Sequence, residues 1–167
     1  MDRAYLETAL EESEKTKDKF LIAYVRIIVD LFNLRTQLRL VAGEPHIAPE
    51  IVCVGGCNFN KSDLVSEEQI LKLLTRYGGD AQWKEAIAEF ESTRDFTLID
   101  KASEEYVMHW LKKQSIDMHS PAPLVAYLVV MKENIQFIRT VKTAKYVGLS
   151  EKLLRDLVRK SFTAYVY

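Results

Sequence analysis

Apolar residues return every three or four positions through most of this chain, whereas alternation with a period of two is scarce. A period near 3.6 is typical of amphipathic helices, so the pattern predicts an all-α fold. The two longest apolar stretches predict long helices from Leu21 to Gly43 and from Leu124 to Gly148. The other expected helices span about residues 3–15, 66–77, 81–90, 95–116 and 150–160.

Local signals support several of these boundaries. Ser66 is followed at the third position by Gln69, which is the pattern of a helix N-cap with its capping box. Asp95 is expected to cap or precede the helix that reaches about residue 116. Two prolines and a Gly-Gly pair predict mainly loop over residues 44–63. The apolar side of the 95–116 helix is expected to hold Leu98, Ala102, Tyr106, His109 and Trp110.

The two long helices share an internal similarity. Leu21-Ile22-Ala23-Tyr24 recurs as Leu124-Val125-Ala126-Tyr127, and residues 30–36 recur, one position out of step, as residues 134–140. Both segments also run on to a glycine at a similar distance. This favours two related repeats, at about residues 1–60 and 95–167, although apolar helices also resemble one another by composition alone.

Charge and length limit the classes of function. The chain has 167 residues with 23 basic and 24 acidic side chains, and this balance argues against a nucleic-acid-binding protein. Residues 121–167 are an exception, because they carry eight Lys or Arg against three acids. The first residues have no signal-peptide pattern, and charges interrupt residues 20–41, so we expect neither a signal peptide nor a transmembrane segment. The expected location is therefore cytoplasmic.

Several segments resemble the C-type subunit of the V/A-type ATPases, which is the counterpart of the d-type subunit in the eukaryotic V-type enzyme. They include Asp2-Arg3-Ala4-Tyr5-Leu6, residues 20–26 and 30–36, Pro123-Leu124-Val125-Ala126-Tyr127-Leu128, and Gly148-Leu149-Ser150-Glu151-Lys152-Leu153-Leu154-Arg155. The Gly55-Gly56 pair also falls where this family has two glycines. Residues 58–117 match by helical pattern only. The chain is similar to roughly the second half of the family's members, so the family's N-terminal portion is expected to be absent.

The resemblance implies part of a funnel-like, all-helical subunit of three similar domains. Such a subunit belongs to the central stalk, where it sits on the membrane rotor ring and receives the foot of the shaft. It couples ion transport to ATP synthesis or hydrolysis, carries no catalytic residues and needs no cofactor or metal. The expected partners are therefore the rotor ring and the shaft subunits, and the expected position is peripheral, on the cytoplasmic face of the membrane.

Basic side chains near the C-terminus are the candidate partner contacts. Lys132, Arg139 and Lys142 fall within about a quarter-turn of one helix face, and Arg155 and Arg159 lie one turn apart in the next helix. Such groups can bind acidic groups on a partner, and they can equally form a solvated helix face.

Two other hypotheses remain open at this stage. One is a helical metal-binding protein that uses His46, Cys53 and Cys57, or Glu105 with His109 one helical turn later. The spacing of the cysteines is poor for zinc, and the Glu105/His109 pair has no second copy. The other is a free-standing helical adaptor.

Charges inside the first long helix need partners, because an isolated buried charge is unfavourable. Asp30 is expected to pair with Arg26, which lies four positions earlier.

Overall fold

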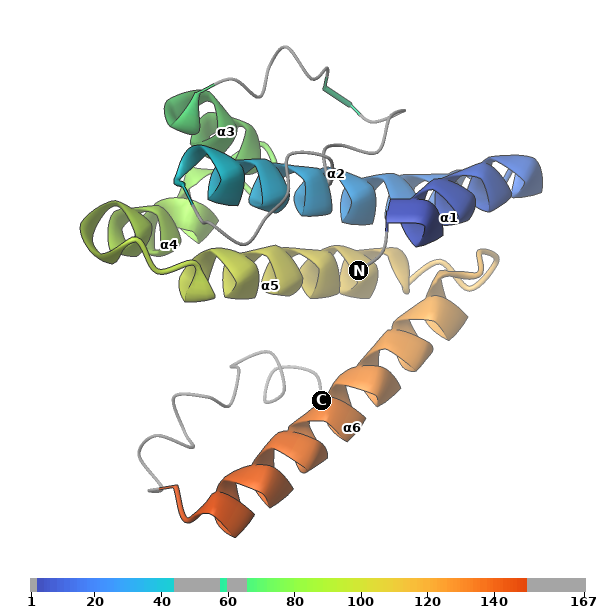
Figure 1. Ribbon diagram of the computed structural model, residues 1–167. Helices are drawn as coiled ribbons and strands as arrows, with labels where there is room; N and C mark the ends of the chain where they lie inside the picture. The colour runs from blue at the N-terminus through green and yellow to red at the C-terminus, as the bar shows by residue number, and fades with distance from the viewer. Residues whose placement is uncertain (1–2, 44–57, 60–65, 150–167) are drawn as a thin grey trace. The chain divides into compact units, whose positions relative to one another are not determined.

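The computed structural model describes residues 3–43, 58–59 and 66–149, and every regular element in these ranges is a helix. The helices are α1 (Arg3–Thr16), α2 (Lys19–Val41), α3 (Glu67–Leu74), α4 (Asp80–Thr93), α5 (Thr97–Gln114) and α6 (Ala122–Val147), as Figure 1 shows. The prediction of an all-α fold is confirmed. Of the described helices, none is both long enough and apolar enough to cross a membrane.

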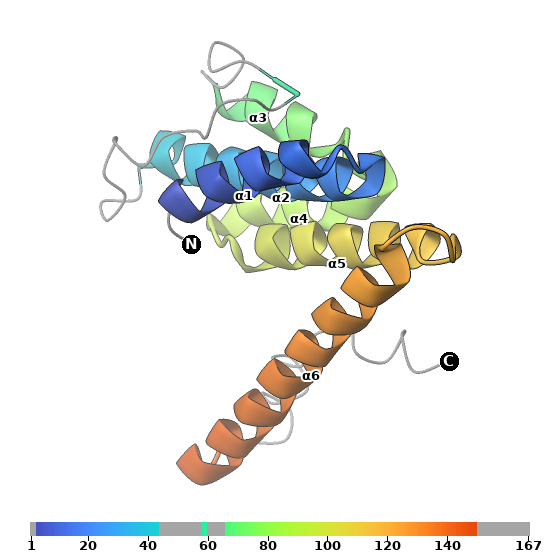
Figure 2. The ribbon, with the colours of Figure 1, turned by 90° about the vertical axis from the view of Figure 1, so that its right-hand side faces the viewer.

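The chain divides into two compact units, residues 1–107 and 108–167, and the boundary falls within α5. In the first unit, α1 and α2 form an antiparallel hairpin (Figures 1 and 2). Lys17 makes the turn with a φ of 57°, and Asp18 caps α2 by accepting a hydrogen bond of 2.9 Å from the Leu21 backbone N–H. The break predicted between these helices is therefore confirmed.

Helix α2 is the centre of the first unit. In both views α3 and α5 lie on opposite sides of it (Figures 1 and 2). Most of its buried apolar side chains recur at helical spacing on one face, whereas Val29 lies on the opposite face and packs with Leu6 and Leu10 of α1. The buried apolar residues of α2 are Phe20, Ile27, Val29, Leu31, Leu34 and Leu38.

Helix α3 begins as predicted and ends earlier than predicted. The Ser66 hydroxyl accepts a hydrogen bond of 3.3 Å from the Gln69 backbone N–H, which confirms the N-cap. The helix ends at Leu74 instead of continuing to about Tyr77. Gly78 and Gly79 then turn the chain with φ of 97° and 84°, a conformation that glycine adopts without strain.

Helices α4 and α5 confirm the two predicted helices, with bounds that differ by one to three residues. Asp95 accepts hydrogen bonds from both the backbone N–H and the hydroxyl of Thr97, as expected for a residue that precedes a helix. The predicted apolar side of α5 is mostly wrong. Ala102 is buried, but Leu98, Tyr106 and Trp110 are only partly buried and His109 is exposed. The buried residues of α5 are instead Ile99, Ala102, Ser103, Val107, Met108 and Leu111, and Phe96 just before the helix is buried as well.

The second unit contains α6, which confirms the predicted helix with bounds that differ by one or two residues. It ends at Val147, and Gly148 follows with a φ of 76°. The Leu149 backbone N–H then donates to the Ala144 carbonyl at 2.9 Å, which closes a Schellman-type C-cap. The helix predicted over residues 150–160 and most of the loop predicted over 44–63 lie outside the described residues.

Candidate partner-binding surface

One face of α6 is a row of large apolar side chains that are exposed. Their spacing alternates between four and three residues, which keeps them within about 40° of one line along the helix. We call this row the α6 stripe, and it consists of Leu124, Leu128, Met131, Ile135 and Ile138. Their exposed fractions are 62%, 57%, 42%, 46% and 63%. Water-exposed side chains of this size in an unbroken row mark a surface that binds another molecule.

Basic groups border the same face. Lys132 and Arg139 each follow a stripe residue directly and lie on the same side of it, and Lys142 continues the stripe one turn beyond Ile138. All three are exposed. The structure therefore brings together three of the predicted contact residues, whereas Arg155 and Arg159 lie outside the described residues. Glu133, the acidic residue within α6, is on the opposite side of the helix.

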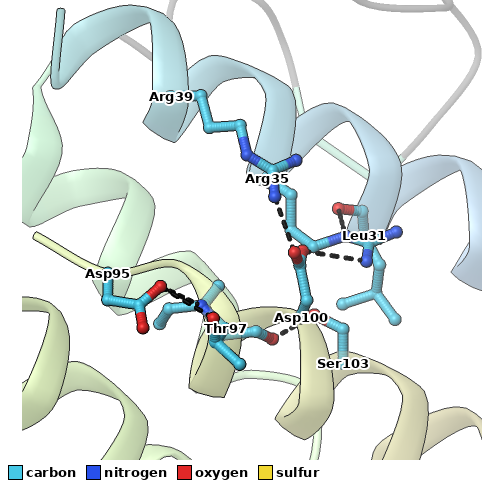
Figure 3. A network of polar contacts seen from close by, with 8 residues as sticks. Leu31, Arg35, Arg39, Asp95, Thr97, Asp100 and Ser103 are labelled. Carbon is cyan, nitrogen blue, oxygen red and sulfur yellow. Dashed lines mark hydrogen bonds and ion pairs between the residues drawn. The ribbon is translucent and has the colours of Figure 1, made fainter. Parts of the chain in front are cut away.

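In the first unit, α2, the helix that matches α6 in sequence, contacts α5 through two arginines. The Arg35 guanidinium lies 3.2 Å from one carboxylate oxygen of Asp100 on α5, and Arg39 donates to the other oxygen at 2.6 Å (Figure 3). Arg39 also lies over the Phe96 ring, 5.1 Å from its centroid. The three charged side chains are 25–28% exposed. Burial lowers the pKa of Arg35, and Asp100 opposes that shift.

A second polar cluster lies deeper in the same unit. Asp30 is fully buried and accepts hydrogen bonds of 2.6 Å from the Tyr77 hydroxyl and 2.6 Å from the Asn58 side-chain amide. The Asn58 backbone N–H donates to it as well, at 3.3 Å. The predicted pair between Asp30 and Arg26 is wrong. Arg26 instead contacts Glu14 of α1 at 3.2 Å, because its side chain extends from α2 toward α1.

Tyr77 joins this cluster to α4 and α5. Its carbonyl accepts a hydrogen bond from the Trp83 indole at 2.5 Å, and its ring meets the Tyr106 ring edge-on, with 5.6 Å between centroids. Burial, followed by the hydrogen bond to Asp30, raises the pKa of Tyr77 far above its usual range. Glycine is favoured at position 78 by its φ of 97°, which other residues rarely adopt, and a Cβ there would also displace the end of the Gln82 side chain.

The candidate metal ligands do not form a site that the structure describes. Glu105 and His109 lie one turn apart on α5, with Glu105 partly buried and His109 exposed. Within residues 3–43, 58–59 and 66–149, no group of three or more His, Cys, Asp or Glu side chains could hold a metal ion. His46, Cys53 and Cys57 lie outside these ranges.

Sequence reasoning missed the residues that hold the first unit together, namely Asp100, Tyr77 and Asn58. Asp100 partners residues 61 and 65 positions away, and Tyr77 partners one 47 positions away. A local sequence pattern cannot predict which residues so far apart in the chain will be in contact. One weak signal was available, because an aspartate among the apolar residues of α2 must have a partner somewhere.

Taken together, the second unit presents an apolar stripe with a basic border, and the first unit anchors its helices through carboxylates. The α6 stripe with its basic border is therefore the candidate partner-binding surface. Comparison with known proteins agrees with the resemblance seen in the sequence. A family model described as the ATP synthase (C/AC39) subunit matches residues 1–157. Neither a curated protein nor a solved structure matches the chain.

Proposed function

Because this chain belongs to the ATP synthase (C/AC39) subunit family, we propose that it is a non-catalytic coupling subunit in the central stalk of a rotary V/A-type ATPase. It joins the central shaft to the membrane rotor ring, for ion transport linked to ATP synthesis or hydrolysis. The observation that carries the proposal is the extent of the family match, which covers all but the last ten residues. The funnel of three similar domains, with two related repeats in this chain, is part of the proposal.

The mechanical requirements of this role agree with the described helices. A coupling element must transmit force without bending, and α2 and α6 contain 23 and 26 residues, or about 35 and 39 Å of continuous helix. In the first unit, the Asp100 ion pairs and the Asp30 cluster each tie α2 to residues distant in sequence. Such cross-links resist sliding of one helix along another.

The proposed partners are the rotor ring and the shaft subunits of the ATPase. We propose that the chain is peripheral, on the cytoplasmic face of the membrane, and that it reaches the membrane through the ring. Lys132, Arg139 and Lys142, with Arg155 and Arg159, are the proposed contacts for acidic groups on these partners. Their exposure on α6 supports the first three.

A binding experiment with purified parts tests this proposal. The full chain is immobilised and mixed with the isolated rotor ring, the shaft subunits, or both, and ATPase activity is measured on the chain alone. We expect retention of at least one partner without nucleotide, and no ATP hydrolysis by the chain. Retention of neither the rotor ring nor the shaft subunits would contradict the proposal, and so would ATP hydrolysis that co-purifies with the chain.

A further inference from the structure

The two long helices match in sequence, but their matching residues differ in exposure. Leu31 and Leu34 of α2 align with Ile135 and Ile138 of α6. The first two are 2% and 0% exposed, whereas the second two are 46% and 63% exposed. The face that α2 buries is thus the face that α6 leaves open.

Helix α5, which contacts α2 through Asp100, shows what kind of helix can lie beside a face of this sequence. In the alignment Arg139 corresponds to Arg35, the residue that contacts Asp100 of α5 at 3.2 Å. Near Asp100 in sequence, Ile99 of α5 and Phe96, which directly precedes α5, are buried and apolar. A helix that carries apolar side chains beside a carboxylate therefore satisfies both the apolar face and the arginine of this unit.

The charge of each candidate partner indicates which one fits the α6 stripe. A second copy of α6 would bring four further basic side chains and one acid, Glu133, which lies on the face away from the stripe. The chain's own residues 150–167 carry four basic and two acidic side chains. Both would bring a net positive charge to a face that Lys132 and Arg139 border, which is unfavourable.

We propose that the α6 stripe is the docking site for a helix of another protein, which presents a leucine- or isoleucine-rich face bordered by aspartate or glutamate. The partner's apolar residues pack between Leu124 and Ile138, and its carboxylates contact Lys132 and Arg139. The alternation of four and three residues sets the geometry, because it is the repeat by which two helices pack along their length. This inference stands on the α6 surface and does not rest on the proposed ATPase role.

Two matched peptides test the proposal on the full chain. Both are 28 residues long with leucine at the two core positions of each heptad, and they carry glutamate or lysine at the bordering positions. Each peptide repels itself, so both are available as single helices for binding. Binding is followed by fluorescence anisotropy at two salt concentrations. We expect the glutamate peptide to bind at least about tenfold more tightly than the lysine peptide, and more weakly as salt rises.

Adjacent substitutions locate the site. Ile135→Glu places a charge in the stripe, and Gln136→Glu places the same charge beside it, outside the stripe. We expect Ile135→Glu to weaken the glutamate peptide by at least about tenfold, and Gln136→Glu to change its affinity less than about threefold. Arg139→Glu should weaken the glutamate peptide and strengthen the lysine peptide. Circular dichroism confirms that each variant remains helical.

Several results would overturn the proposal. Equal affinity for the two peptides removes the charge argument, and equal effects of the two glutamate substitutions place the site elsewhere. In light scattering, the mass of the chain could double as its concentration rises while the Ile135→Glu variant keeps the mass of one chain. That result would make a second copy the occupant. Binding that appears only after deletion of residues 150–167 makes the chain's own tail the occupant.

Discussion

Asp30 carries a fully buried carboxylate that needs hydrogen-bond donors, and the substitution Asp30→Ala removes this group. In the native protein this carboxylate accepts from Tyr77 and from two donors of Asn58. After the substitution the Tyr77 hydroxyl is left without its acceptor at a position that is 9% exposed. Asn58 is exposed, so its donors can turn to water instead.

The expected loss follows from these surroundings. A hydrogen bond to a charged group contributes about 1.5–3 kcal/mol, and an unsatisfied buried donor is unfavourable by a similar amount. With the Asn58 donors compensated by water, we expect Asp30→Ala to lower the free energy of unfolding by about 3 kcal/mol. For a chain of this size that corresponds to a decrease in Tm of about 6–12 °C.

Urea unfolding followed by circular dichroism measures this change, and a double-mutant cycle assigns it to a partner. Tyr77→Phe should lower the free energy of unfolding by about 1.5 kcal/mol and couple to Asp30→Ala by about 1 kcal/mol or more. Arg26→Ala is the matched control, because the sequence places Arg26 one turn from Asp30 while the structure places it against Glu14. Its coupling to Asp30→Ala should be near zero.

Two results would refute the reasoning. A loss below about 1 kcal/mol for Asp30→Ala would mean that the carboxylate is not buried in this cluster. A coupling to Arg26 larger than the coupling to Tyr77 would restore the helical pair predicted from sequence.

Three further predictions concern the same unit. Asp100→Ala leaves two guanidinium groups without their shared carboxylate, and should lower the free energy of unfolding by about 2 kcal/mol in urea, whereas the exposed control Glu85→Ala should change it by less than about 0.5 kcal/mol. Tyr77 has a raised pKa in the folded state, so its contribution is complete below the pKa of an unfolded tyrosine, near 10, and is lost as pH rises above it. Urea unfolding at pH 8, 10 and 11 should therefore show a shallower alkaline loss in Tyr77→Phe than in the native chain, and equal slopes would contradict this assignment. Lys17→Gly relieves a φ of 57° and should raise the free energy of unfolding, measured in urea, by about 0.5 kcal/mol, whereas a decrease would contradict strain at this turn.

Most of the secondary structure could be predicted because its signals are local. The hairpin break before Asp18, the N-cap at Ser66 and the glycine after Val147 each depend on residues within one turn of the feature. The end of α3 was placed too late because the Gly-Gly pair after Tyr77 was the only local stop signal, whereas the helix ends at Leu74 and the Tyr77 hydroxyl contacts the distant Asp30. Tertiary contacts here override local propensity.

The candidate surface could be predicted in part, because helical spacing is also a local signal. Helical spacing alone places Lys132, Arg139 and Lys142 on one face, and the structure keeps them there. What the sequence could not report is exposure, since α2 and α6 carry nearly the same pattern while burying it to different extents. The buried side of α5 was also misjudged, because its apolar residues extend around much of the helix and only packing selects among them.

The central claim is that this chain couples the rotor ring to the shaft, and ion transport by the assembled enzyme tests it most directly. ATP hydrolysis and ion uptake are measured together in vesicles that contain the complete ATPase, with and without this chain. We predict that ATP hydrolysis persists without the chain while ion uptake is lost, and that adding the chain back restores uptake. Ion uptake that proceeds at the same rate per ATP without the chain would contradict the claim.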